Sequence, residues 1–358
     1  MLRTILLLSL LPVAPLAPWP QPSAAAPPAI ASPASGLHQP VPDADIADFP
    51  YRRYHTYDTL GRSIALYLSK ADESKPLPLV LCVQGSGSQS VFLEVDTPKG
   101  KRIVSGGPDA AVLAQFRDRV RVLVVEKPGV EFLVQPARPG SADQASDEFK
   151  REHSLDRWTT ALNAALESAR SLPGVDASRI FALGHSEGGQ VVCHLAAANH
   201  AITHVASLAG GGPTQLFDLI ELARSGSLGD TSGTPQSRAA AIINGWRRVL
   251  QNPDSPTKMF LGHPHLRWSS FLRTSPARAL ESTAAAVFIA QGTADTNTSP
   301  VAADMLYAEL LAQGRDVTYE RVEGGDHGFM TNGDNAAGWK ATIKKAVDWF
   351  LKAENPSK

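Results

Sequence analysis

The sequence predicts an α/β fold in which a mostly parallel central sheet carries helices on both faces. Short apolar runs recur along the chain and stop at glycine or small polar residues, which is typical of strands buried on both faces. Helical patterns lie between these runs, as expected where helices cover such a sheet. At residues 182–190 (ALGHSEGGQ) one apolar run passes through a single serine into an apolar helical stretch, which predicts a sharp turn.

The individual elements follow from these patterns in chain order. Residues 51–57 and 63–68 flank a Thr-Leu-Gly-Arg turn and look like a hairpin. We expect further strands at residues 79–83, 120–125, 179–183, 204–209, 286–290 and 317–322. We expect helices at residues 155–169 and 190–198, and a C-terminal helix with a stripe of Trp339, Ile343, Val347 and Phe350.

One segment breaks the alternation of strands and helices. Residues 213–282 show helical patterns but no predicted strand, and this is longer than an ordinary connection. An insertion between two late strands of a parallel sheet lies over the C-terminal ends of the strands, where ligands bind in such sheets. We therefore expect a helical cap at 213–282 within one domain that spans residues 51–358.

The N-terminus has a different composition. Arg3 precedes a leucine-rich core that is too short to span a bilayer, and small-residue sites follow at 24–26 and 29–31. This layout predicts a secretory signal peptide over residues 1–31, with a disordered cytosolic tail as the alternative interpretation. Residues 32–50 are rich in proline and alanine and predict a linker that need not fold. We expect a secreted or periplasmic protein with no stable membrane anchor.

Composition narrows the class of protein further. The 358 residues carry a formal net charge of −1, so no basic excess exists to neutralise phosphates and nucleic acid is not an expected partner. A hydrophobic fraction of 43% suits a globular protein with a sizeable core. The two cysteines, Cys82 and Cys193, lie in apolar segments and are expected as buried free thiols, with a disulfide as the alternative.

Ser186 occupies the predicted strand-to-helix turn. Gly184 and Gly188, at positions −2 and +2, let the two elements come close and leave the serine side chain exposed at the apex. A serine hydroxyl is a poor nucleophile at neutral pH and needs a histidine base, which in turn needs an orienting carboxylate. A catalytic Ser186 therefore requires both of these partners elsewhere in the chain.

Asp295 and His327 meet this requirement. Asp295 directly follows the strand predicted at 286–290, and His327 follows the one at 317–322, so both would lie with Ser186 at one edge of the sheet. Asp304 is a rival for the carboxylate, because Asp295 could instead cap the helix after Pro300.

Other polar residues near these motifs have simpler interpretations. The side chains of His185 and Glu187 are expected to line the mouth of the site or face solvent. His263 and His265 have no carboxylate or cysteine at ligand spacing, so we expect no metal site, and the sequence implies no cofactor.

From about residue 50 onward the chain resembles the α/β-hydrolase superfamily, in particular its dienelactone-hydrolase and prolyl-oligopeptidase-like branches. Gly184-His-Ser186-Glu-Gly188 matches the nucleophile elbow, and the chain order Ser…Asp…His is that of the superfamily. The Gly-Asp-His327-Gly-Phe ending is also similar to those branches. The loop after the third strand, Gln84-Gly-Ser86-Gly87, has glutamine where many members have histidine.

The resemblance implies a serine hydrolase with Ser186, Asp295 and His327 as its catalytic triad. It also implies an oxyanion hole that is formed by the backbone N–H of Glu187 and by that of Ser86 or Gly87. We expect such an enzyme to cleave a carboxylic ester through an acyl-enzyme, with a small-molecule ester or a short peptide-like substrate. A peptidase, amidase or thioesterase with the same triad is one alternative, and a non-catalytic binding protein on a hydrolase scaffold is another.

Overall fold

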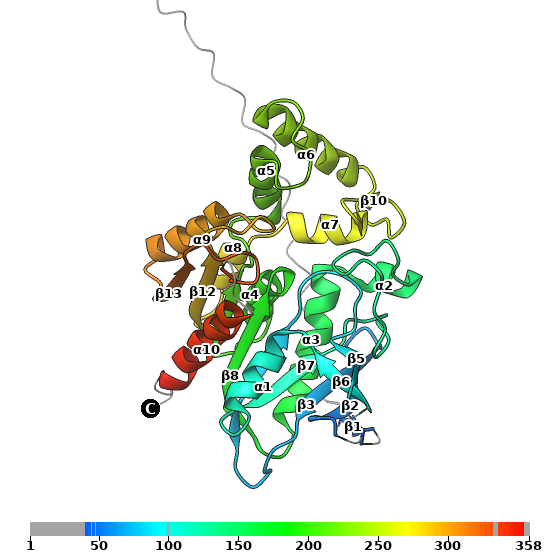
Figure 1. The fold of residues 1–358 in the computed structure, drawn as a ribbon, viewed down its shortest axis with the longest axis vertical. Helices are drawn as coiled ribbons and strands as arrows, with labels where there is room; N and C mark the ends of the chain where they lie inside the picture. The colour runs from blue at the N-terminus through cyan, green and yellow to red at the C-terminus, as the bar shows by residue number, and fades with distance from the viewer. Residues whose placement is uncertain (1–39, 44, 47, 99, 332–335, 354–358) are drawn as a thin grey trace, which may run out of the picture. The chain divides into compact units, whose positions relative to one another are not determined.

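The central sheet positions every predicted site residue. The computed structural model describes residues 40–43, 45–46, 48–98, 100–331 and 336–353, and in this part the main sheet has nine strands. Their order is β1 (Val41–Pro42), β2 (Tyr51–Tyr57), β3 (Ser63–Ser69), β7 (Arg121–Val125), β4 (Leu77–Val83), β8 (Val175–His185), β9 (His204–Leu208), β12 (Ala286–Gly292) and β13 (Val317–Val322). The strands from β7 to β13 run parallel, whereas β1, β2 and β3 pair in antiparallel fashion at one side (Figure 1).

Helices cover both faces of this sheet, as the sequence predicts. One core packs the sheet against α3 (Leu155–Arg170), α4 (Glu187–Ala198), α8 (Pro276–Glu281) and α9 (Pro300–Ala312). The other core lies between the sheet and helices α1 (Pro108–Phe116) and α10 (Ala337–Lys352). A short helix, α2 (Asp147–Glu152), precedes α3. The fold class expected from the sequence is therefore confirmed.

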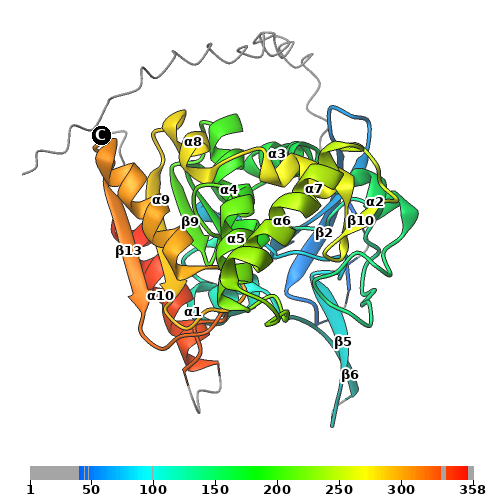
Figure 2. The same cartoon turned by 90° about the horizontal axis from the view of Figure 1, so that it is seen from above.

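The segment between β9 and β12 holds four helices. Three of them, α5 (Gln215–Ser225), α6 (Pro235–Leu250) and α7 (His265–Leu272), share a small core of Leu219, Ile242, Val249 and Trp268 and lie together in Figures 1 and 2. The fourth helix, α8, instead packs into the core of the main sheet through Ala277 and Leu280. The segment also contains a two-residue ladder, β10 (Met259–Phe260) with β11 (His263–Pro264), where the sequence showed no strand pattern.

A hairpin that the sequence did not predict precedes α1. Strands β5 (Phe92–Thr97) and β6 (Gly100–Ser105) pair with each other and extend away from the main sheet (Figure 2). Phe92 is the one residue of the two strands whose side chain is buried. Leu93 and Val95 are half-buried on one face of β5, and this apolar alternation is too short to predict a strand by itself.

The described part of the N-terminal region is packed against the domain. The predicted signal peptide at residues 1–31 lies outside the described residues. Within the predicted linker, β1 pairs with β2, and the Phe49 ring is buried among the rings of the second core, where its nearest neighbour is Phe92. The domain therefore includes residues that we expected to belong to a linker. No helix in the described ranges is long and apolar enough to cross a membrane.

Both cysteines are buried and free, as expected. Cys82 lies on β4 and Cys193 on α4, and burial raises the pKa of each thiol. Neither thiol therefore contributes a reactive thiolate at neutral pH.

Candidate active site

The turn at Ser186 is as sharp as the sequence predicts. Strand β8 ends at His185 and α4 begins at Glu187, so Ser186 is the single residue between them. Its φ of 58° and ψ of −123° are unusual for a residue with a side chain, and such strain tends to occur at functional sites. A Cβ on Gly184 would lie 2.0 Å from the Gly188 carbonyl oxygen, so only glycine allows this approach of strand and helix.

His327 and Asp295 are in direct contact. They follow β13 and β12, and His327 Nδ1 lies 2.9 Å from Asp295 Oδ2. The His185 ring bonds to the His327 carbonyl oxygen at 2.8 Å and so ties the histidine loop to the end of β8. The rival carboxylate, Asp304, lies on α9 and accepts from Tyr319 and Arg321 instead.

The Asp295 carboxylate is enclosed by hydrogen-bond donors. Oδ1 accepts from the backbone N–H groups of Asn297 (2.8 Å) and Thr298 (3.0 Å), and Oδ2 accepts from Gln291 (2.8 Å) and the Thr298 hydroxyl (2.6 Å) as well as from His327. Burial raises the pKa of Asp295, but the hydrogen bonds and the His327 charge outweigh it and lower the pKa below its ordinary value. The site therefore favours a charged carboxylate beside the imidazole.

Ser186, His327 and the loop after β4 line one cavity of about 880 Å³. Among the described residues the Ser186 hydroxyl forms no hydrogen bond with His327, and such bonds often tighten only when a substrate is bound. Apolar side chains from the segment between β9 and β12 line the same cavity: Leu219, Leu228, Leu261 and Trp268. The volume is within the range of small-molecule sites.

Two backbone N–H groups near Ser186, those of Ser86 and Glu187, have no hydrogen-bond acceptor in the described part of the chain and are free to bind an oxyanion. Glu187 is the first residue of α4, and the loop residue Gly85 lies against Ser186, so that a Cβ on Gly85 would be 3.3 Å from Ser186 Cβ. Ser86 and Glu187, the residues that carry the two predicted donors, both line the cavity that holds Ser186.

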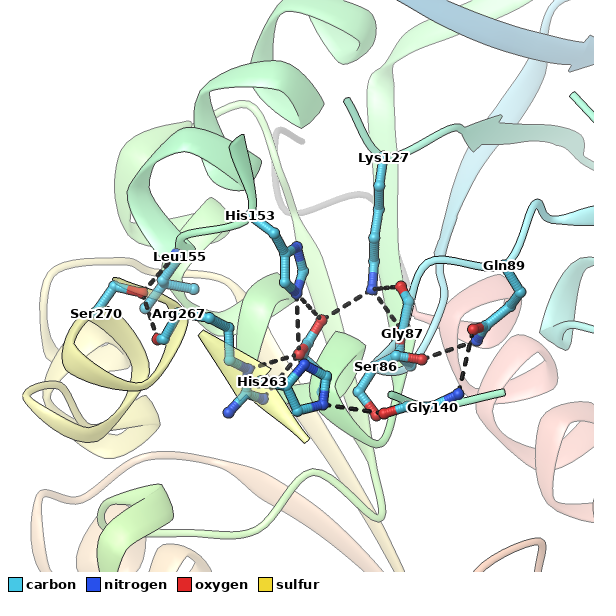
Figure 3. A network of polar contacts seen from close by, with 12 residues as sticks. Ser86, Gly87, Gln89, Lys127, Gly140, His153, Leu155, His263, Arg267 and Ser270 are labelled. Atoms are coloured by element: carbon cyan, nitrogen blue, oxygen red, sulfur yellow. Dashed lines mark hydrogen bonds and ion pairs between the residues drawn. The ribbon is translucent and has the colours of Figure 1, made fainter. Parts of the chain in front are cut away.

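We expected the Glu187 side chain to line the mouth of the site or to face solvent, and the second alternative is wrong. The side chain is buried, and its Oε1 lies 3.0 Å from Lys127 Nζ and 3.2 Å from His153 Nε2, while Oε2 lies 2.8 Å from Arg267 Nη2. These three partners of Glu187 are labelled in Figure 3. Burial raises the pKa of Glu187, but the neighbouring cations outweigh it and hold the pKa well below its ordinary value. Burial lowers the pKa of His153 to about 4, so this imidazole is neutral at pH 7.

Sequence reasoning missed these partners and one further acid, Asp218. Lys127 follows the strand predicted at 120–125, so its place at the functional edge of the sheet was a usable signal. Arg267 lies on α7, and no sequence pattern connects it with Glu187. Asp218 lines the cavity and accepts from the Ser299 N–H, and burial raises its pKa to about 7.

The remaining histidines considered from the sequence bond to backbone atoms. His263 Nε2 lies 2.9 Å from the Gly140 carbonyl oxygen, and His265 Nδ1 lies 3.3 Å from that of Asn252. Within the residues that the structure describes, no cluster of three or more His, Cys, Asp or Glu side chains has the geometry of a metal site.

A parallel sheet of this order, with a strained serine between strand and helix and a His–Asp pair at the same edge, defines the α/β-hydrolase class. The model of the alpha/beta hydrolase family matches residues 103–338, and the chain belongs to that family. No curated protein is similar enough in sequence to give a match. Family membership supports hydrolase activity and leaves open whether the substrate is an ester or a peptide.

Several solved structures share the fold. Est1E from Butyrivibrio proteoclasticus is 16% identical, with a TM-score of 0.54, and the match covers 84% of this chain and 99% of Est1E. Pyrococcus horikoshii acylaminoacyl peptidase is 14% identical, with a TM-score of 0.56, over 87% of this chain but 43% of the peptidase. Porphyromonas gingivalis dipeptidyl peptidase 4 is 14% identical, with a TM-score of 0.53, over 84% of this chain and 36% of its own. The chain thus spans less than half the length of these two peptidases.

Proposed function

We propose that this protein is a serine hydrolase that cleaves a carboxylic ester through an acyl-enzyme intermediate. The observation that carries the proposal is the Asp295–His327 pair beside the strained Ser186 turn, with Ser186 and His327 on the wall of one cavity. In this assignment Ser186 is the nucleophile, His327 the general base and acid, and Asp295 the residue that orients the imidazole.

Each step of the proposed reaction uses a group at this site. His327 Nε2 takes the proton of the Ser186 hydroxyl as the oxygen attacks the ester carbonyl carbon. The backbone N–H groups of Ser86 and Glu187 stabilise the resulting oxyanion. His327 then gives the proton to the leaving alcohol, and the acyl group stays on Ser186. His327 next deprotonates a water molecule that attacks the acyl carbonyl carbon, and it returns this proton to the Ser186 oxygen as the acid is released.

A peptidase or amidase that acts on substrates with a free amino group is the second candidate. Asp218 supports it, because a buried carboxyl group on the cavity wall can accept a hydrogen bond from a substrate ammonium. A thioesterase would use the same chemistry as the esterase. An aminoacyl p-nitroanilide and a p-nitrophenyl ester separate these candidates, since hydrolysis of the anilide would favour the peptidase and hydrolysis of the ester alone would favour the esterase.

Labelling with a fluorophosphonate probe tests the proposal directly, because the probe reacts with an activated serine. We expect the wild-type protein to be labelled and to hydrolyse p-nitrophenyl esters, and Ser186→Ala to do neither while it keeps its melting temperature. Ser227→Ala is a matched control, since Ser227 lines the same cavity but lies in the connection between α5 and α6. Wild-type turnover in Ser186→Ala would refute the assignment, and an unlabelled wild type would favour a non-catalytic binding protein.

We also propose that the protein is exported, on the basis of the N-terminal leucine-rich core and the small-residue sites that follow it.

A further inference from the structure

Lys127 binds backbone carbonyl groups of the loop that follows β4. It lies two residues beyond β7, and its side chain is fully buried. The ammonium Nζ lies 2.6 Å from the Gly85 carbonyl oxygen, 3.2 Å from that of Gly87 and 3.0 Å from Glu187 Oε1 (Figure 3). These three acceptors use all three N–H groups of an ammonium, whereas a neutral amine has only two. The contacts therefore require the charged form of Lys127.

The Gly85 carbonyl that Lys127 binds belongs to the same peptide group as the Ser86 N–H. In a trans peptide the C=O and N–H bonds point in opposite directions, so a carbonyl fixed on Lys127 directs the Ser86 N–H away from the lysine. A cation on the carbonyl oxygen also polarises the peptide group, which strengthens its N–H as a donor. Lys127 thus acts on the orientation and on the donor strength of one predicted oxyanion contact.

The other predicted donor is connected to the same ammonium. The Glu187 N–H opens α4, and the Glu187 carboxylate is the third acceptor of Lys127. One side chain therefore holds together the loop and the helix turn that present the two N–H groups. His153 and Arg267 contact Glu187 but make no hydrogen bond to the loop residues Gly85–Gly87.

We propose that Lys127 is a positioning residue of the oxyanion hole, which orients and polarises the Gly85–Ser86 peptide and fixes it relative to the Glu187 N–H. This inference rests on the proposed serine hydrolase function. Burial lowers the pKa of Lys127, while the Glu187 carboxylate opposes this change.

Lys127→Met is the informative variant. Methionine keeps the length of the aliphatic stem, and Glu187 remains paired with Arg267 and bonded to His153, so no buried carboxylate is left without a partner. Loss of a whole oxyanion donor lowers kcat by about 10²–10³. Because Lys127→Met keeps the donor and removes only its support, we expect kcat for p-nitrophenyl butyrate to fall by about 10–10², with KM changed by less than about threefold.

A trifluoromethyl ketone supplies the readout that a purely structural role would not change. The serine adduct of such a ketone carries an oxyanion, so its inhibition constant should rise in Lys127→Met by the same factor by which kcat falls. His153→Gln is the matched control, since glutamine can still donate to Glu187 and the loop contacts of Lys127 are untouched. In this control kcat and the ketone inhibition constant should stay within about threefold of the wild type.

The results for these variants can overturn the proposal in several ways. An unchanged kcat in folded Lys127→Met, or a rise in KM with kcat intact, would overturn the assignment, and so would equal losses in His153→Gln. If Lys127→Met does not fold, Lys127→Gln and Lys127→Arg replace it, and we expect the charged arginine to retain more activity than the neutral glutamine. The reverse order would also overturn the proposal. Failure of the wild type to label with fluorophosphonate would instead count against the nucleophile itself.

Discussion

Replacement of Asp295 by asparagine should remove activity and leave the fold almost intact. The Oδ1 position faces two backbone N–H groups, those of Asn297 and Thr298, which can only donate. The amide oxygen of the new side chain therefore takes this position, and its NH₂ group takes the place of Oδ2. The NH₂ group then faces Gln291, the Thr298 hydroxyl and His327 Nδ1.

All three of these neighbours can adapt to a donor. Gln291 can turn its amide, because its Oε1 has no hydrogen-bond partner among the described residues. The Thr298 hydroxyl can rotate to accept, and His327 can accept at Nδ1 if its proton moves to Nε2. The melting temperature should therefore fall by no more than about 3 °C, which corresponds to about 1–2 kcal/mol in a domain of this size.

The same adaptation disables the proposed base. With its proton on Nε2, His327 cannot accept the proton of Ser186, and this wrong tautomer lowers kcat by about 10⁴ in the corresponding variant of a serine protease. A factor of 10⁴ is about 5.4 kcal/mol of activation free energy. The assay is steady-state hydrolysis of a p-nitrophenyl ester, and kcat should drop by this order.

Asp304→Asn provides the matched control, since Asp304 is a partly exposed carboxylate that contacts Tyr319 and Arg321. We expect its kcat to stay within about twofold of the wild type, because nothing at the cavity depends on it. If Asp295→Asn kept more than a tenth of the activity, or if the two variants exchanged their effects, the tautomer argument would be refuted.

Three further predictions concern the turn, the pH dependence and the N-terminus. Gly188→Ala should lower the free energy of unfolding by about 3 kcal/mol or more in a urea titration, because its Cβ would lie 2.3 Å from the Val83 carbonyl oxygen; a stable variant would contradict this. Burial lowers the pKa of His153, His185, His194 and His204 to about 4, so their share of stability is present above pH 6.5 and lost as the pH falls towards 4. Asp218 and Glu126, whose pKa values are raised to about 7, act in the opposite direction. Because four histidines oppose these two acids, the melting temperature should still fall from pH 7 to pH 4.5. A rise would show that the acids dominate. Mass spectrometry of protein from the native host should find a mature N-terminus between residues 27 and 37, and an intact Met1 on a cytosolic protein would exclude export.

The main sheet and the contact between His327 and Asp295 could be predicted because each depends on local sequence. Strands such as β4 and β12 are buried on both faces and therefore form apolar runs that end in a recognisable loop. Residues that follow parallel strands meet at one edge of the sheet, so the order along the chain was enough to bring Asp295 and His327 together.

The remaining features depend on tertiary contacts that no local pattern carries. The pairing of Glu187 with Arg267 joins residues 80 positions apart, on the helix after the nucleophile and on α7. The hairpin β5–β6 buries only Phe92 fully, and the alternation of apolar and polar residues over 93–96 in β5 is too short to predict a strand by itself. The burial of Phe49 depends on rings contributed by later strands, and its proline-rich surroundings favoured a linker instead.

The contact between α7 and Glu187 fixes one wall of the cavity that holds Ser186. Arg267 donates to Glu187 through Nε and Nη2, at 3.2 Å and 2.8 Å, and its guanidinium also lies over the Trp268 and Phe271 rings. Swinging α7 outward would break both charge-assisted bonds, at about 1.5–3 kcal/mol each, so fewer than about one molecule in a hundred would be open at any time. The wall that Arg267 and Trp268 of α7 contribute to the cavity is therefore expected to be fixed and not a hinged lid. For the proposed hydrolase this predicts that substrates are selected by the shape of the cavity as it stands, and that turnover does not wait for a closing motion of α7.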